Sequence, residues 1–198
     1  AVPLAEFAAG PATDPTRPGL MFYPVAVSCA YDGTILVLED TSADPTHGGA
    51  QVARISAYDL SMNPVKRFVD SNGDPTYWLY LTGATGTTFI DMQTVGDERK
   101  TYIYVLSYKG AGIDPSDYAM SIYTYGATPP AQNPLVATPN MAAAALAVDM
   151  WHTVYTENYA MVTDGAGTPA GPDVPGAGPD GRTGPSISMW LPPTGARR

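Results

Sequence analysis

Three short strand-like segments recur in the same order along this chain of 198 residues, and this weak internal repeat constrains the fold more than any other feature. The clearest copies are ILVLE at residues 35–39, IYVLSY at 103–108 and VYTENY at 154–159. A second set follows them, with ISAY at 55–58, MSIY at 120–123 and ISMW at 187–190. Because β-branched and aromatic residues bounded by turn residues are typical of strands, each set predicts one strand per repeat.

A third set precedes the other two, with VAVS at residues 25–28, FIDM at 89–92 and LAVD at 146–149. These segments are nearly continuously apolar, which predicts strands that are buried on both faces. The alanine-rich stretch at 141–147 favours a helix by intrinsic propensity, whereas the repeat predicts a strand from about Ala145 onward, and we follow the repeat. The lone cysteine, Cys29, is expected to be a small buried residue inside a strand.

A fourth strand is expected at residues 65–69 in the first repeat and at 134–138 in the second, with a spare candidate at residues 4–7. Gly and Pro contribute 20 residues each, which favours a turn-rich, all-β chain over a helical bundle. A unit of four antiparallel strands, with a buried inner strand and a polar outer strand, is a β-propeller blade.

The first repeat carries a resemblance to a known family. It contains PVAV at residues 24–27, DGTILVLE at 32–39, RISAYD at 54–59 and NPV at 63–65. This succession of an apolar strand, an Asp-Gly turn, a second apolar strand with an acidic end and an Arg-Ile-x-x-aromatic-Asp segment resembles the NHL-type β-propeller repeat. The second and third repeats lack the Asp-Gly hairpin and the Arg. The resemblance implies a propeller fold over about residues 20–192 but little about activity, because propellers host many functions.

The chain is therefore interpreted as about three all-β propeller blades of four antiparallel strands each, incomplete or closed by a partner chain. We expect an N-terminal extended segment or closing strand at 1–20, blade 1 at 21–75, blade 2 at 76–139, blade 3 at 140–192 with a Gly/Pro-rich insert at 160–185, and a tail at 193–198. Propellers usually have at least about four blades. Three arrangements follow: a fragment of a longer propeller, two copies in one six-bladed ring, or a larger assembly that supplies the rest. Since residue 1 is Ala, we expect a processed chain or a piece of a longer one.

These features favour a non-enzymatic interaction or structural module in a larger protein or assembly, bound to a protein partner or to a second copy of itself. Two alternatives stay open: a metal-dependent propeller hydrolase or lyase, and a carbohydrate-binding propeller that uses exposed Tyr and Trp. Tyr77, Trp78 and Tyr80 are the candidate partner-binding residues. Such aromatic side chains more commonly fill the space between blades.

Few residues suggest chemistry. The two histidines, His47 and His152, are expected in solvated loops, and the three-histidine zinc site of some propeller lyases cannot be assembled from them. The segment DSNGD at 70–74 spaces oxygen ligands as calcium loops do, but it lacks the Gly and Glu of an EF-hand. Asp91 and Asp149 end inner strands, where paired carboxylates would hold a cation, although the repeat alone explains their spacing. We expect no cofactor, with calcium as the weak alternative.

Charge and composition limit the partners and the compartment. A net charge of −9 and only three Lys argue against nucleic acid, because phosphate binding needs clustered Lys and Arg. No stretch approaches the roughly 18 apolar residues of a membrane span. A single Cys excludes a disulfide scaffold but fits either a secreted or a cytosolic protein, and an extracellular or cell-surface location is favoured.

Overall fold

The structure is a computed structural model, and it describes residues 18–19, 21–41, 51–82, 86–97, 100–110, 117–125, 135–137, 142–159 and 186–190. This part of the chain is all-β, as the sequence predicts, and its strands form antiparallel sheets that do not close into a barrel. The predicted N-terminal strand at residues 4–7, His47, the insert at 160–185 and the tail at 193–198 lie outside the described residues.

The first sheet contains β1 (Pro24–Cys29), β2 (Ile35–Asp40), β3 (Gln51–Tyr58) and β6 (Trp78–Thr82), hydrogen-bonded in that order. The first three strands confirm the predicted rows. The prediction of the fourth strand at residues 65–69 is wrong, because β6 pairs with β3 instead. The strands of this sheet therefore extend beyond the predicted division at residue 75.

The segment predicted as the fourth strand folds separately. Its end forms β4 (Phe68–Val69), which pairs with β5 (Pro75–Thr76) in a small two-stranded sheet. Phe68 turns into the core, and the Arg67 guanidinium is held by Asp32. By contrast, β6 has the alternation of a half-buried strand, with Leu79 and Leu81 both buried.

The second sheet contains β7 (Thr87–Gly96), β8 (Thr101–Lys109), β9 (Tyr118–Thr124) and β10 (Leu135–Ala137) in that order. The third contains β11 (Ala142–Val148), β12 (Val154–Tyr159) and β13 (Ser186–Trp190). The predicted rows are confirmed in both sheets, including the fourth strand of the second. The alanine tract is strand β11, since pairing with β12 overrides its helical propensity.

The first strand of each sheet in chain order, which is β1, β7 or β11 and is called its inner strand below, has a β-bulge at the same place in the repeat. The bulges lie between Pro24 and Ala26 in β1, between Phe89 and Asp91 in β7, and between Ala143 and Ala145 in β11. A bulge interrupts the ladder and increases the local twist of a strand, so it is a specific structural feature. Its recurrence shows that the three sheets are built on one plan.

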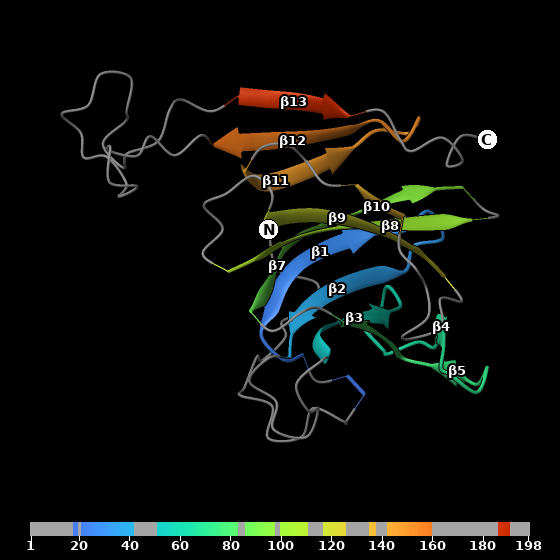
Figure 1. The fold of residues 1–198 in the computed structure, drawn as a ribbon. Coiled ribbons are helices and arrows are strands. Elements are labelled where there is room, and N and C mark those ends of the chain that lie inside the picture. Colours follow the sequence, from blue (N-terminus) through green and yellow to red (C-terminus); the bar gives the residue numbers. More distant parts are fainter. Residues whose placement is uncertain are drawn as a thin grey trace, which may run out of the picture.

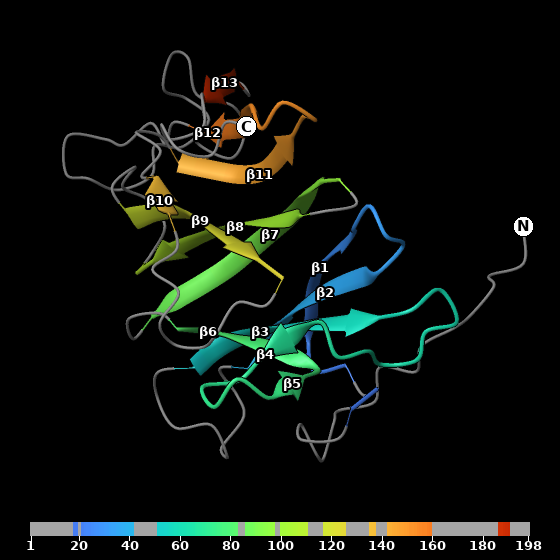
Figure 2. The same cartoon turned by 90° about the vertical axis from the view of Figure 1, so that its right-hand side faces the viewer.

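The three sheets are stacked, with the second between the first and the third (Figures 1 and 2). They approach each other most closely along β1, β7 and β11. The Ser28 and Thr94 hydroxyls, 2.8 Å apart, join β1 to β7, and the backbone N–H of Leu146 donates to Asp91 Oδ2 at 2.8 Å to join β11 to β7. Side-chain bonds thus connect neighbouring inner strands that do not share a backbone ladder.

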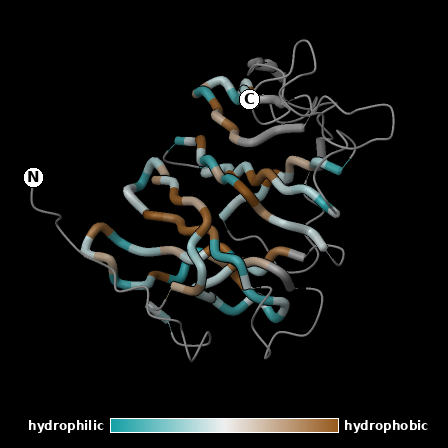
Figure 3. The backbone as a smooth tube through the Cα atoms, turned by 90° about the vertical axis from the view of Figure 1, so that its left-hand side faces the viewer, coloured by the Kyte–Doolittle hydropathy of each residue, from teal (hydrophilic) through white to brown (hydrophobic). Residues whose placement is uncertain are grey.

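Two apolar clusters fill the spaces between sheets, and hydrophobic segments run through the middle of the array (Figure 3). One cluster joins the first and second sheets through side chains such as Leu38, Ile55 and Met92. The other joins the second and third through side chains such as Leu106 and Leu146. Each sheet–sheet contact therefore has its own core.

The prediction that the segments at 25–28, 89–92 and 146–149 are strands buried on both faces is wrong for β1. Val27 of β1 is 64 % exposed, and Cys29, predicted to be buried, is also exposed. The continuously buried strands are instead β2 and β8. The physical reason is what covers each strand: Met92 of β7 and Leu146 of β11 are buried against the preceding sheet, whereas no sheet precedes β1 among the described residues.

Candidate functional site

Four hairpin turns in the described part of the chain share one backbone geometry. In each, the first residue's N–H donates to the carbonyl of the fifth, and the fourth residue's N–H donates back to the carbonyl of the first. The fourth residue has positive φ, which is typical of a type I turn followed by a left-handed residue. The turns span residues 30–34, 59–63, 70–74 and 149–153, and their left-handed residues are Gly33, Met62, Gly73 and His152.

An aspartate holds three of these turns in the same way. Oδ1 of Asp59, Asp70 and Asp149 each accepts the backbone N–H of the residues two and four positions ahead. In the first turn, Asp32 is instead the third residue and accepts the N–H of Thr34. The segment at 70–74, for which calcium binding is the weak alternative, is a hairpin turn in which the Asp70 carboxylate accepts backbone N–H groups.

The turns at 30–34, 59–63 and 149–153 lie at one end of the array. The first two are adjacent, because a Cβ on Gly33 would lie 3.6 Å from Leu60 Cδ1. The β1–β2 and β11–β12 hairpins point to the same side, on the right in Figure 1. This end of the array, formed by the three turns, is called the hairpin end below.

Large apolar side chains at the hairpin end face solvent. Tyr31 is 68 % exposed, Leu60 76 %, Met150 75 % and Trp151 72 %. Tyr31, Leu60 and Met150 all occupy the second position of their turns. Single exposed apolar residues are ordinary, but several of them at one end of the array make that end a candidate interaction surface.

His152 lies at the hairpin end between the second and third sheets. Its Nδ1 is 2.8 Å from the Tyr104 hydroxyl, and its ring packs edge-on against Tyr102 at a centroid distance of 4.7 Å. The Lys100 ammonium lies 4.8 Å from the centroid of the Tyr102 ring. The prediction of a solvated loop histidine is confirmed for the turn but not for the side chain, which is partly buried against two tyrosines.

The titration of this group follows from its surroundings. Desolvation lowers the pKa of His152 below 6.5, and the charge of Asp149 opposes the shift only in part. Burial, with the charges of Tyr102 and Asp149, raises the pKa of Tyr104 to about 12. At neutral pH both rings are therefore uncharged, and the pair is a hydrogen-bonded contact between sheets.

The predicted pair of Asp91 and Asp149 has no shared role among the described residues. Asp91 binds the backbone of β11 through Leu146 and also accepts the N–H of Met92. Although partial desolvation opposes it, N–H donors from Thr153 and Trp151 lower the pKa of Asp149, which also accepts the Tyr155 hydroxyl at 3.3 Å. Each carboxylate stabilises local structure.

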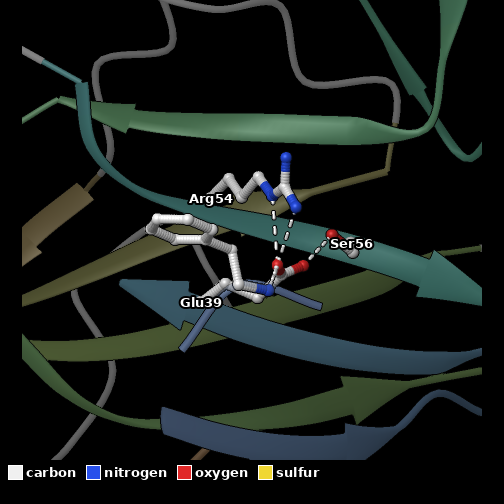
Figure 4. Close-up of polar contacts among 4 residues, drawn as sticks. Glu39, Arg54 and Ser56 are labelled. Atoms are coloured by element: carbon white, nitrogen blue, oxygen red, sulfur yellow. Dashed lines mark hydrogen bonds and ion pairs between the residues drawn. The ribbon is translucent and has the colours of Figure 1, made fainter. Parts of the chain in front are cut away.

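A charged cluster is buried on the face of the first sheet that points away from the second (Figure 4). Glu39 and Arg54 are directly opposite in the β2–β3 ladder, are both 0 % exposed, and form an ion pair with an N–O distance of 2.8 Å. Glu39 also accepts the Ser56 hydroxyl and the backbone N–H of Phe22. Burial and the charge of Glu39 raise the pKa of the neighbouring Tyr58 to about 12.

The predicted binding residues Tyr77, Trp78 and Tyr80 lie next to this cluster, on and before β6. All three side chains are partly buried, with Tyr77 and Tyr80 on either side of Trp78. The Arg54 guanidinium lies 5.1 Å from the centroid of the Trp78 ring. Trp78 thus helps to cover a buried cation, while a role of the three aromatics in partner binding stays a prediction.

The sequence pattern did not single out Tyr31, Leu60, Met150 or Trp151. A signal was available, since each stands inside a hairpin turn, where a polar residue is usual. No three His, Cys, Asp or Glu side chains are grouped to hold a metal ion within the described ranges. In the same part of the chain, no helix has the length and apolar character that crossing a bilayer requires.

Comparison with known proteins adds no assignment. No protein-family model matches the sequence, and no significant match was found among curated proteins.

Proposed function

We propose that the chain is a segment of an NHL-type β-propeller that acts as a non-enzymatic interaction or structural module within a larger protein or assembly. The observation that carries this proposal is the recurrence of one strand plan in three consecutive sheets. Each sheet runs in antiparallel order from an inner strand outward, and each inner strand has a bulge at the same position.

The packing between the sheets supports a propeller-like arrangement. The sheets approach most closely along their inner strands, as blades do around a central axis. Loops at one end of such an arrangement are carried on a rigid scaffold, and this is where binding residues commonly lie. The hairpin end, with Tyr31, Leu60, Met150 and Trp151 exposed, is the surface we assign to partner binding.

The hairpin end can be tested by substitution. Leu60, Met150 and Trp151 are changed together to Ser, which removes exposed apolar surface and leaves both cores untouched. The wild-type and triple-variant proteins are immobilised, and proteins captured from an extract of the source cells are compared by quantitative mass spectrometry. The proposal predicts proteins that wild type enriches and the triple variant loses, while an Asn72→Ser control, at the exposed turn outside the hairpin end, retains them. Identical capture by all three proteins would contradict it.

Carbohydrate binding is the second candidate, and the exposure of Tyr31 and Trp151 at the hairpin end favours it. Exposed aromatic rings offer flat apolar faces beside a polar rim. Glycan-array binding that is lost in Trp151→Ser but kept in Leu60→Ser would support this candidate over a protein partner. A glycan array without any signal would exclude it for the sugars tested.

A further inference from the structure

Equivalent positions in the three inner strands differ sharply in exposure. Aligning the bulges places Val27, Met92 and Leu146 at one position of the repeat. Met92 is 0 % exposed and Leu146 is 5 % exposed, whereas Val27 is 64 % exposed. The residue type is large and apolar in all three cases, so the difference lies in what covers it.

The covering element is the preceding sheet. Met92 belongs to the apolar cluster that contains Leu38 and Ile55 of the first sheet. Leu146 belongs to the cluster that contains Leu106 and Ile122 of the second sheet. This position therefore packs against the sheet that comes one repeat earlier. Val27 lies where the inner strand of such a sheet would dock, whereas Val37, Glu39 and Arg54 on the same face of the first sheet are already buried.

Further apolar surface surrounds Val27. Tyr23 is 60 % exposed and Val25 is 38 % exposed, and Cys29 at the end of the same strand is exposed as well. We call Tyr23, Val25, Val27 and Cys29 the β1 face. An exposed apolar edge strand is an association site unless something covers it.

The third sheet, at the other end of the array, also has an exposed side. In the contact between the first and second sheets, Ala26 of β1 packs against the cluster of Met92, and Ser28 hydrogen-bonds to Thr94. The positions of Ala26 and Ser28 are taken in β11 by Ala145 and Ala147. Ala147 is exposed, because no fourth sheet follows among the described residues.

From these positions we propose that the β1 face binds the third sheet of a second copy of this chain, head to tail. The contact continues the interface that already joins the first sheet to the second and the second to the third. It would set Val27 of one copy near Ala145 of the other, and Cys29 near Ala147. This inference rests on the proposed propeller, and mutual docking of two copies would complete a ring of six sheets.

The contact between the first and second sheets indicates where a disulfide between two copies can be placed. Cys29 is equivalent to Thr94, and Ala147 is equivalent to Ser28, whose hydroxyls are 2.8 Å apart. The two side chains at this position point toward one another, as the side chains of a disulfide bond must. Ala147→Cys in a chain with its native Cys29 is therefore expected to form a disulfide between two copies.

The experiment oxidises the full chain carrying Ala147→Cys and compares it with Ser71→Cys, a control at an exposed turn far from either open side. We expect the variant to become a covalent dimer of twice the 20.8 kDa of one chain, in which mass spectrometry finds the peptide of Cys29 linked to the peptide that carries the substitution. Sedimentation of the uncrosslinked wild type should also give a dimer, and Val27→Glu should return it to a monomer. A monomeric wild type, or dimer yields equal to those of Ser71→Cys, would overturn the proposal.

A second disulfide separates the failure of this inference from failure of the propeller itself. In a Cys29→Ser background, Ser28→Cys with Thr94→Cys should close within one chain, because it probes the contact between the first and second sheets. If this bond forms while the intermolecular one does not, the sheets are arranged as described and the second copy is the wrong occupant. If neither bond forms, the described arrangement of the three sheets is contradicted as well.

Discussion

The first and third sheets share an inner-strand bulge and an antiparallel order, yet they differ in what they bury. At one cross-strand position the first sheet sets Glu39 opposite Arg54, and the third sets Asn158 opposite Ser186. At another position the first sheet exposes Val27, and the third buries its equivalent, Leu146. The same backbone plan therefore accommodates a buried ion pair in one sheet, while the exposure of its inner strand depends on whether a neighbouring sheet covers it.

The turns of these two sheets differ in the same way. Residues 30–34 and 149–153 have the same backbone hydrogen bonds, but the left-handed position holds Gly33 in one and His152 in the other. Gly adopts positive φ without cost, whereas a side chain there is strained by about 1–2 kcal/mol. His152 offsets that strain with its bond to Tyr104, which ties the third sheet to the second.

The largest expected effect concerns the ion pair that only the first sheet has at this register. Arg54→Met should lower the free energy of unfolding by about 3–5 kcal/mol, because Glu39 would remain buried without its cation. Urea unfolding measures the loss. The double variant Glu39→Gln with Arg54→Met should recover part of it, and a loss below about 1 kcal/mol in the single variant would show that the cluster is not buried as described.

The two equivalent inner-strand positions make a matched pair. Leu146→Ala should lower the free energy of unfolding by about 2–5 kcal/mol, since it leaves a cavity between sheets. Val27→Ala should change it by no more than about 0.5 kcal/mol when the chain is dilute and monomeric, because exposed substitutions are nearly neutral. Equal losses at the two positions would mean that their exposure does not differ, and thermal unfolding of both variants in parallel is the measurement.

The left-handed positions give a smaller effect. Gly33→Ala should lower the free energy of unfolding by about 1–2 kcal/mol through positive φ alone, since a Cβ there meets only an ordinary contact with Leu60. At the other turn, His152→Gly should be more stable than His152→Ala by about 1 kcal/mol, because both lose the Tyr104 bond and only Gly relieves the strain. If the two His152 variants unfold alike, the turn does not hold its left-handed residue.

The smallest effect depends on pH. The pKa of His152 is lowered in the fold by desolvation, so the unfolded chain binds the proton more tightly. Stability from this group is therefore complete at neutral pH and declines as the pH falls through the unfolded value of about 6.5. His152→Gln should show a shallower decline between about pH 7 and pH 5 than wild type, with His47 present in both; parallel curves would contradict the assignment.

Much of this fold was predictable from the sequence because strand periodicity is a local property. The rows at 25–28, 35–39 and 55–58 follow from the repeat and from their apolar, β-branched and aromatic content, and the repeat predicts β11 against the helical propensity of its alanines. The fourth strand of the first sheet was misplaced, since residues 65–69 and β6 both look like strands and only tertiary packing chooses between them.

The candidate surface was less predictable. The exposure of an inner strand depends on whether another sheet covers it. The apolar sequence of β1 is the same with or without a preceding sheet, so the sequence alone does not predict the exposure of β1. The contact between His152 and Tyr104 joins residues 48 positions apart on different sheets, which no spacing rule anticipates. The Glu39–Arg54 pair was present in the predicted pattern, but its burial follows only from three-dimensional packing.

The most direct measurement is a disulfide between the second and third sheets. By the repeat, Gln93 and Val148 stand where Ser28 and Thr94 meet in the first contact. In a Cys29→Ser background, Gln93→Cys with Val148→Cys should form an intramolecular disulfide readily, and Gln93→Cys with Ser71→Cys should not. Peptide mapping that finds the first bond would show that both contacts follow one plan; equal crosslinking of the two variants would contradict three equivalent sheets about a common axis.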